Sequence, residues 1–164
     1  MQDIAGCRII VKDVPTQDEV VARLKQLFET LSVVDRREQP SHGYRAVHAV
    51  VSASSKFIEI QVRTSLQHLW AELSEKFSDV IDPAIKYGGG DPKVLESLSV
   101  ASQEIVQVEI AESVLHDILG AVAKERRLSE DTGRDIMKAQ QIIAAHRRRV
   151  VSLIASMGEV VPEN

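Results

Sequence analysis

Hydrophobic and polar residues follow two different rhythms along this 164-residue chain. Up to residue 63 the apolar residues come in short β-branched runs, and after residue 64 they recur every three or four positions. The first rhythm is typical of strands and the second of amphipathic helices. We therefore predict an α+β fold: a mixed sheet of about four to five strands with flanking helices, followed by a C-terminal antiparallel helical hairpin.

The strands of the predicted sheet lie in the first third of the chain. Four runs rich in Val, Ile and Leu predict strands over residues 8–11, 31–34, 44–52 and 57–63. Between the first two, Thr16 and Glu19 have the spacing of a capping box. This spacing predicts that a helix begins at Thr16 and precedes the second strand.

The helices are predicted from residue 64 onward. Thr64 and Gln67 can cap a helix that ends before Asp82, and the glycines of residues 88–90 then interrupt the pattern. The apolar positions that follow predict two long helices, the second with a seven-residue repeat through Ile136, Ile143, Val150 and Met157. We therefore divide the chain into a domain over 1–87 and a helical hairpin over 91–158.

Composition narrows the classes of protein. With 44% hydrophobic residues the chain can bury a core, while 4% aromatic residues argue against an extended base-stacking platform. The net charge of −4 argues against a uniformly basic nucleic-acid surface. No signal peptide or membrane span is evident, so we expect a cytoplasmic protein that makes no membrane contact. Cys7 is the single cysteine and is expected to be a small buried hydrophobe.

Polar side chains interrupt the apolar strands at regular intervals. Alternation along the fourth strand puts Glu59, Gln61 and Arg63 on one face, and alternation along the third puts Tyr44 and His48 together. A carboxylate and a guanidinium that share a sheet face can form part of a binding pocket. A solvated pair of Glu59 with Arg63, a packing role for Tyr44 and a structural role for His48 remain alternatives at this point.

A second carboxylate, Asp3, precedes the first strand. Asp3 and Glu59 would repel each other in one pocket unless a cation lay between them, and Mg²⁺ commonly takes one or two carboxylates together with substrate phosphates. Arg8, Arg63 and His48 could then stabilise phosphate charge. The sequence therefore predicts a Mg²⁺ and nucleotide site on this sheet face.

Two other features have plainer interpretations. No strand leads into the glycines of residues 88–90, and no Lys-Ser or Lys-Thr follows them, so they predict a hinge and not a phosphate loop. The arginines of residues 147–149 are expected to form a solvated helix face, with a nucleic-acid patch as the alternative.

Three motifs occur in order at close intervals. They are Asp3-Ile-Ala-Gly6-Cys-Arg8, His42-Gly-Tyr44-Arg-Ala-Val-His48 and Glu59-Ile-Gln61-Val-Arg63-Thr. Together they resemble the synthetase domain of the RelA/SpoT family, most of all its short single-domain members, over about residues 1–80. Members of this family transfer a pyrophosphoryl group from ATP to the 3′-hydroxyl of GDP or GTP, which forms (p)ppGpp. The resemblance implies a nucleotidyltransferase-like fold.

The resemblance also implies roles for individual residues. Asp3 corresponds to a Mg²⁺ ligand, and Glu59 to a second metal ligand or to the base that activates the acceptor hydroxyl. Tyr44 corresponds to the tyrosine that stacks on guanine, and His48 to a histidine near the acceptor phosphates. The remaining substrate-binding candidates are Arg8, Gln61, Arg63 and His42, the last of which stands where many members carry an Asn that helps to read guanine.

Three functional hypotheses follow from these motifs. The first is (p)ppGpp synthesis from ATP and GDP or GTP with Mg²⁺, with weak or no transfer expected because the family's donor-binding helices normally precede Asp3. The second is transfer to the 3′ end of tRNA, suggested by His42 and by basic residues at 126–127 and 147–149. The third is an inactive nucleotide-binding or oligomerisation module. In each case we expect a homo-oligomer formed through the C-terminal helices.

Overall fold

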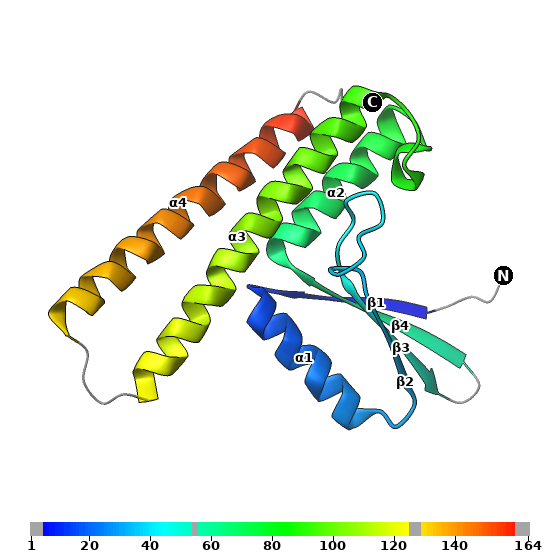
Figure 1. Cartoon of the computed structure of the whole chain (residues 1–164). Coiled ribbons are helices and arrows are strands. Elements are labelled where there is room, and N and C mark those ends of the chain that lie inside the picture. The colour runs from blue at the N-terminus through cyan, green and yellow to red at the C-terminus, as the bar shows by residue number, and fades with distance from the viewer. Residues whose placement is uncertain (1–4, 54–55, 125–128, 160–164) are drawn as a thin grey trace.

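The computed structural model describes residues 5–53, 56–124 and 129–159, and within them it contains one sheet and two groups of helices (Figure 1). The elements are β1 (Ala5–Val11), α1 (Val14–Leu27), β2 (Leu31–Asp35), β3 (Val47–Ala53), β4 (Lys56–Thr64), α2 (Ser65–Val80), the 3₁₀ turn η1 (Ile85–Tyr87), α3 (Pro92–Lys124) and α4 (Glu130–Glu159). The predicted α+β architecture is confirmed. No helix in the described ranges is long and apolar enough to cross a membrane.

The four described strands lie in the order β1-β4-β3-β2. β1 runs parallel to β4, whereas β4 pairs with β3 and β3 with β2 in antiparallel fashion, so the sheet is mixed, as predicted. The register aligns Gly6 with Glu59, Arg8 with Gln61 and His48 with Gln61. Residues paired in register share a face, so these side chains emerge on the same side of the sheet.

The two faces of the sheet differ in chemistry. One face carries the buried residues Val47, Ala49 and Val62, and α1 packs on it through Val21 and Leu24. The period-two alternation places the polar residues of β3 and β4 on the opposite face, which α1 does not cover. The predicted separation of apolar and polar side chains is therefore confirmed.

The strands differ from their predicted bounds in one place that concerns the site. We predicted a strand from residue 44, but β3 begins at Val47. Ser41 and Tyr44 instead close a short bridge of their own, because His42 (φ 53°) and Gly43 (φ 90°) adopt left-handed backbone conformations that turn the chain. Tyr44 therefore lies on a loop beside the sheet.

Two further local predictions are wrong. The predicted capping box of Thr16 and Glu19 is not the start of α1, because the carboxylate of Asp13 caps the helix by accepting the Thr16 N–H at 2.9 Å. A helix start at Asp13 places Pro15 in the first turn. Proline has no backbone N–H, and in the first turn that N–H would have no partner within the helix, so this start is favourable. Cys7 is exposed instead of buried, since β1 is an edge strand of the described sheet.

The capping box at the start of α2 is confirmed. Thr64 accepts the backbone N–H of Gln67, and the Gln67 side chain accepts the Thr64 N–H. From this start α2 packs against α3 and α4 in a second core, where the Trp70 indole donates to the Leu98 carbonyl at 2.8 Å. The cap thus fixes the direction in which the chain leaves the sheet at Arg63.

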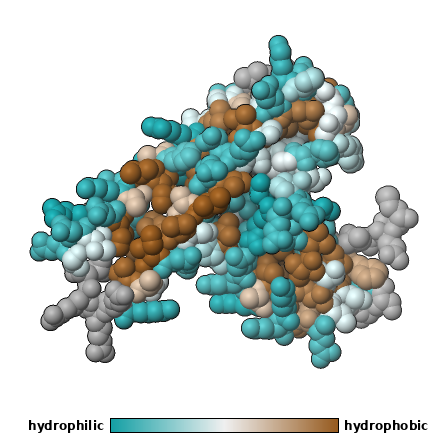
Figure 2. Space-filling view, in the orientation of Figure 1, coloured by the Kyte–Doolittle hydropathy of each residue, from teal (hydrophilic) through white to brown (hydrophobic). Residues whose placement is uncertain are grey.

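α3 and α4 run side by side in opposite directions, which confirms the predicted hairpin (Figure 1). Their inner faces share the core with α2 through Leu98, Ile105, Val108, Val150 and Ile154. From Ile110 onward the large apolar side chains of α3 become more exposed, with Ile110, Val114 and Ile118 each at least 44% exposed. Figure 2 shows apolar surface gathered over this end of the hairpin.

A buried polar cluster at the junction of β4 and α2 connects the sheet and α1 to α3. Glu109 of α3 accepts hydrogen bonds from Thr64 at 2.5 Å and from Gln67 at 3.0 Å. Gln67 also accepts from Gln17 of α1, whose amide donates to the Val62 carbonyl as well. These side chains are at most 7% exposed, so each needs the partners it has.

Substitution of Glu109 is expected to change how stability depends on pH. Burial raises the pKa of the Glu109 carboxyl above its ordinary value of 4.5, against the hydrogen bonds from Thr64 and Gln67. Such a group stabilises the fold fully below its ordinary pKa, and that contribution is lost as pH rises through the folded-state pKa. The Glu109→Gln variant keeps an acceptor oxygen and does not ionise. The difference in the free energy of unfolding, Glu109→Gln minus wild type, should therefore increase as pH rises above 4.5.

Urea denaturation across a range of pH measures this effect. Glu96→Gln, an exposed change on the same helix, serves as the control and should follow the wild type. A difference between Glu109→Gln and wild type that stays constant with pH would contradict the argument.

Candidate functional site

Five side chains on the open face of the sheet form a closed ring of hydrogen bonds. Tyr44 contacts His48 (Oη to Nε2, 2.9 Å), and His48 contacts Glu59 (Nδ1 to Oε1, 2.6 Å). Gln61 donates to Glu59 at 3.1 Å, and Arg63 donates to both Gln61 and Tyr44 at 2.9 Å. We call this set the hydrogen-bond ring. It brings together residues of the second and third sequence motifs.

The donors and acceptors of the ring fit only one arrangement of protons when His48 is neutral. Arg63 has donors only, so the Tyr44 oxygen accepts from it and the Tyr44 hydroxyl donates to Nε2 of His48. Nδ1 of His48 then carries the proton that Glu59 accepts. Every link of the ring therefore has one donor and one acceptor.

Glu59 is held as a carboxylate. Partial burial alone would raise its pKa, but hydrogen bonds from His48 and Gln61, aided by the positive charge of Arg63, outweigh burial and hold the pKa of Glu59 below its usual range. Each carboxylate oxygen accepts one hydrogen bond within the ring and keeps further acceptor capacity. The Glu59 side chain is 30% exposed, so a ligand can reach it.

Arg63 is the least accessible member of the ring, at 3% exposure. It forms no ion pair with Glu59, so the predicted alternative of a solvated surface pair is wrong. Its guanidinium carbon lies 5.0 Å from the centre of the Tyr44 ring, and its Nε and Nη1 have no partner among the described residues. Arg63 therefore supports one face of Tyr44 from beneath.

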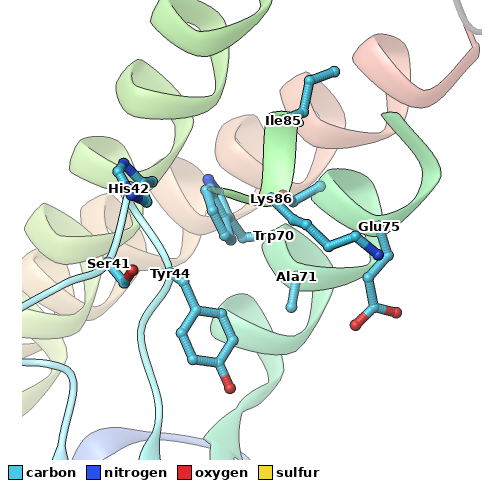
Figure 3. A pocket seen from close by; sticks show the side chains of 9 residues that line it. Ser41, His42, Tyr44, Trp70, Ala71, Glu75, Ile85 and Lys86 are labelled. Carbon is cyan, nitrogen blue, oxygen red and sulfur yellow. The ribbon is translucent and has the colours of Figure 1, made fainter. Parts of the chain in front are cut away.

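Tyr44 connects the ring to a cavity of about 300 Å³ (Figure 3). The cavity is bounded by the loop that carries Tyr44, by α2 and by η1. Its lining residues are Ser41, His42, Tyr44, Trp70, Ala71, Ser74, Glu75, Ile85 and Lys86. An aromatic ring at the wall of a cavity of this size can stack on a flat heterocycle.

His42 belongs to the same wall but not to the ring. A Cβ added at Gly88 would collide with the His42 imidazole, so the imidazole lies directly against the Gly88 backbone. Gly88 is itself in the left-handed region, at φ 80°. This contact holds the loop of residues 41–44 against the turn that follows η1, and it explains why a glycine stands there.

Arg8 is on the same sheet face but in a separate hollow. With Gly6, Cys7 and Gln61 it lines an open space of about 260 Å³ between β1 and β4. Gln61 is therefore shared between this hollow and the hydrogen-bond ring. Arg8 is exposed, and its guanidinium is available to an anion at the edge of the sheet.

Asp3, the other predicted metal ligand, lies outside the described residues. Within those residues no group of three or more His, Cys, Asp and Glu side chains is arranged to hold a metal ion. Glu59 fits a Mg²⁺ site of the kind that uses one or two carboxylates and completes its coordination with phosphates and water. It supplies a hard, ionised oxygen ligand with acceptor capacity to spare.

Two features of the site were missed at the level of sequence. Glu75 and Lys86 line the cavity with Tyr44, yet neither belongs to the motifs, and only the folding of η1 back onto α2 places them there. Arg147, one of the residues behind the tRNA hypothesis, bonds Glu112 at 2.6 Å and Ser65 at 2.5 Å. It is therefore engaged within the fold.

The motif-bearing half of the chain matches a known family. Residues 1–78 match the region found in RelA / SpoT proteins. The chain is 37% identical over 90 residues to uncharacterized proteins of Mycobacterium tuberculosis and Mycobacterium bovis, and the match covers 53% of this chain. It covers 33% of those proteins, so the chain spans about a third of the length of the curated relatives it matches.

Solved structures show the same fold. The small alarmone synthetase 1 from Bacillus subtilis, solved bound to its product pppGpp, is 32% identical with a TM-score of 0.52, and the match covers 75% of this chain and 65% of that one. A GTP pyrophosphokinase family protein from Streptococcus pneumoniae is 22% identical with a TM-score of 0.55, and it covers 74% of this chain and 63% of that one. The latter supports the fold alone.

Removing the Tyr44 hydroxyl should destabilise the protein. Tyr44→Phe leaves Nε2 of His48 without a donor and takes one acceptor from the buried Arg63. An unsatisfied buried polar group costs about 1–3 kcal/mol, and we expect a loss of that size in the free energy of unfolding. Chemical denaturation measures it.

The control for Tyr44→Phe is Tyr87→Phe, since Tyr87 is 75% exposed. It should unfold like the wild type. If Tyr44→Phe and Tyr87→Phe have equal effects, the hydroxyl of Tyr44 does not hold the ring together.

Proposed function

We propose that residues 1–78 of this chain, which match the region found in RelA / SpoT proteins, form the acceptor side of a nucleotide pyrophosphotransferase. The proposed reaction joins the 3′ oxygen of GDP or GTP to the β-phosphorus of ATP, releases AMP and yields (p)ppGpp. The observation that carries the proposal is the hydrogen-bond ring, which ties Tyr44 at the cavity wall to the Glu59 carboxylate through a single histidine. A base-binding element and an acidic group are thereby held at a fixed separation.

Tyr44 is the proposed platform for the acceptor base. Arg63 lies against the aromatic ring of Tyr44 and donates to its hydroxyl, which fixes the orientation of the aromatic ring. The base therefore meets a surface that is already ordered. Stacking on an aromatic side chain supplies roughly 1–3 kcal/mol per base. Because the Tyr44 side chain is preorganised, little of the stacking energy is spent on ordering the protein.

Glu59 is the proposed acidic group at the reacting end of the acceptor. His48 and Gln61 hold its carboxylate in place and keep it ionised, which suits a metal ligand or an acceptor of the 3′-hydroxyl proton. A bound Mg²⁺ would neutralise phosphate charge as the transfer proceeds. Both ring nitrogens of His48 are engaged in the hydrogen-bond ring, so His48 positions Glu59, and Arg8 offers a positive group to the acceptor phosphates. The chain's contribution is therefore positioning and charge, as phosphoryl transfer generally requires.

The proposal predicts that Glu59→Gln lowers transfer by orders of magnitude while GDP still binds, because the amide removes the negative charge but keeps the side-chain shape. Labelled ATP, GDP and Mg²⁺ are incubated with each variant, and the products are separated by thin-layer chromatography. Glu72→Gln, on an exposed position of α2, is the matched control.

Equal transfer by Glu59→Gln and wild type would contradict the proposed reaction, because it would remove Glu59 from the chemistry. A wild type that binds neither GDP nor GTP would contradict the proposed acceptor site. A wild type that binds GDP and transfers weakly agrees with an acceptor side, whereas complete absence of product favours the third hypothesis, an inactive nucleotide-binding module.

We also propose that the chain self-associates through the exposed apolar face of α3. Ile110, Val114 and Ile118 recur on that face at intervals of four residues, more than the contact with α4 uses (Figure 2). The double variant Val114→Glu/Ile118→Glu should therefore have a lower molar mass in solution than the wild type. Light scattering at micromolar concentration measures it, and a wild type that appears only as an 18.2 kDa species would contradict self-association.

A further inference from the structure

The cavity beside Tyr44 is bordered by two opposite charges that the proposed reaction does not use. Glu75 projects from α2 and Lys86 from η1, and both line the cavity. Figure 3 shows Tyr44 on one side of Ala71 and Glu75 on the other, with Lys86 reaching over from η1. A flat ring stacked on Tyr44 would therefore present its edge toward these two side chains.

The fold fixes the backbone positions of both residues. Glu75 is one helical turn after Ala71, so the two share a face of α2, and the small Ala71 side chain leaves the space between Tyr44 and Glu75 open. η1 is fixed to α2 by Ile85, which is 2% exposed, and by the Lys86 N–H, which donates to Ser78 at 3.1 Å. The charges thus belong to the wall of a formed cavity.

Both charged groups are free to bind a ligand. None of the ion pairs among residues 5–53, 56–124 and 129–159 includes Glu75 or Lys86. The Trp70 indole N–H, which also lines the cavity, is already taken by the Leu98 carbonyl. The hydroxyls of Ser41 and Ser74 and the imidazole of His42 line the cavity as well, but Glu75 and Lys86 are the two lining residues that carry a full charge.

The arrangement matches the edge of guanine. Guanine presents two adjacent donors, N1–H and the N2 amino group, next to the O6 acceptor. A carboxylate accepts two donors and an ammonium donates to one acceptor. Adenine presents an acceptor at N1 beside a donor at N6, so a carboxylate facing it would meet a lone pair. Hypoxanthine lacks the N2 amino group.

From this geometry we propose that Glu75, assisted by Lys86, selects guanine over adenine and hypoxanthine in the acceptor nucleotide. The proposal rests on the proposed function, because it assumes that the base stacks on Tyr44. It makes Glu75 a specificity-determining residue of the acceptor site.

The test compares the binding of GDP, IDP and ADP to the full chain. Trp70 is the only tryptophan and lines the cavity, so its fluorescence reports occupancy. A hydrogen bond to a charged group contributes about 1.5–3 kcal/mol, so wild type should bind GDP roughly ten- to a hundredfold more tightly than IDP. ADP should bind more weakly still.

Two substitutions of Glu75 give different signatures. Glu75→Ala should bind GDP and IDP with equal affinity. Glu75→Gln presents one acceptor and one donor, which suit N6 and N1 of adenine, so the preference for GDP over ADP should fall by at least tenfold and ADP binding should improve. A merely structural role would weaken all three nucleotides together.

The control is Glu72→Gln, whose carboxylate lies 3.2 Å from His68 and outside the cavity; it should leave all three affinities unchanged. If wild type binds GDP but both Glu75 variants keep the wild-type ratios, the specificity proposal is overturned and the proposed function stands. If wild type binds none of the three nucleotides, the proposed function fails as well.

Discussion

The buried guanidinium of Arg63 constrains the whole site. Arg63 is 3% exposed, no carboxylate among the described residues pairs with it, and only its Nη2 has hydrogen-bond partners there. Its hydrogen bonds go to Tyr44 and Gln61, and its positive charge lies beneath the aromatic ring. Since Tyr44 is on a loop, this burial is what joins the loop to the sheet and closes the hydrogen-bond ring.

The rest of the fold places Arg63 where this is possible. Residue 63 is the last but one of β4, and Thr64 caps α2 immediately afterward. The cap is tied to α1 through Gln17 and to α3 through Glu109. Three helices therefore fix the end of the strand whose side chain supports Tyr44. α1 covers the apolar face of the sheet, so the polar side chains lie on the opposite, uncovered face.

Much of this arrangement follows from the sequence, because successive side chains along a strand point to opposite faces of the sheet. That rule put Glu59, Gln61 and Arg63 on one face, and the register with β3 adds His48. It could not show that Arg63 would be buried, because burial depends on the loop of Tyr44 folding over the sheet. The predicted strand from residue 44 was wrong for the same reason, since His42 and Gly43 turn the chain.

Side chains recruited from distant elements also escaped prediction. Nothing in the local sequence identifies the partner of Glu112, which is Arg147 of α4. Glu75 and Lys86 meet at the cavity only because Ile85 anchors η1 to the helical core. The spacing of Thr16 and Glu19 predicted a cap at Thr16, but Asp13 caps α1. Such contacts are tertiary, and periodicity carries no information about them.

The central claim is that the hydrogen-bond ring organises an acceptor site in which a guanine base lies on Tyr44. The position of GDP in a crystal structure of this chain tests it most directly. We predict the base stacked on the face of Tyr44 that Arg63 does not occupy, with its edge toward Glu75 and the ring still closed through His48 and Glu59. A base bound away from Tyr44, or a ring opened by the nucleotide, would contradict the account.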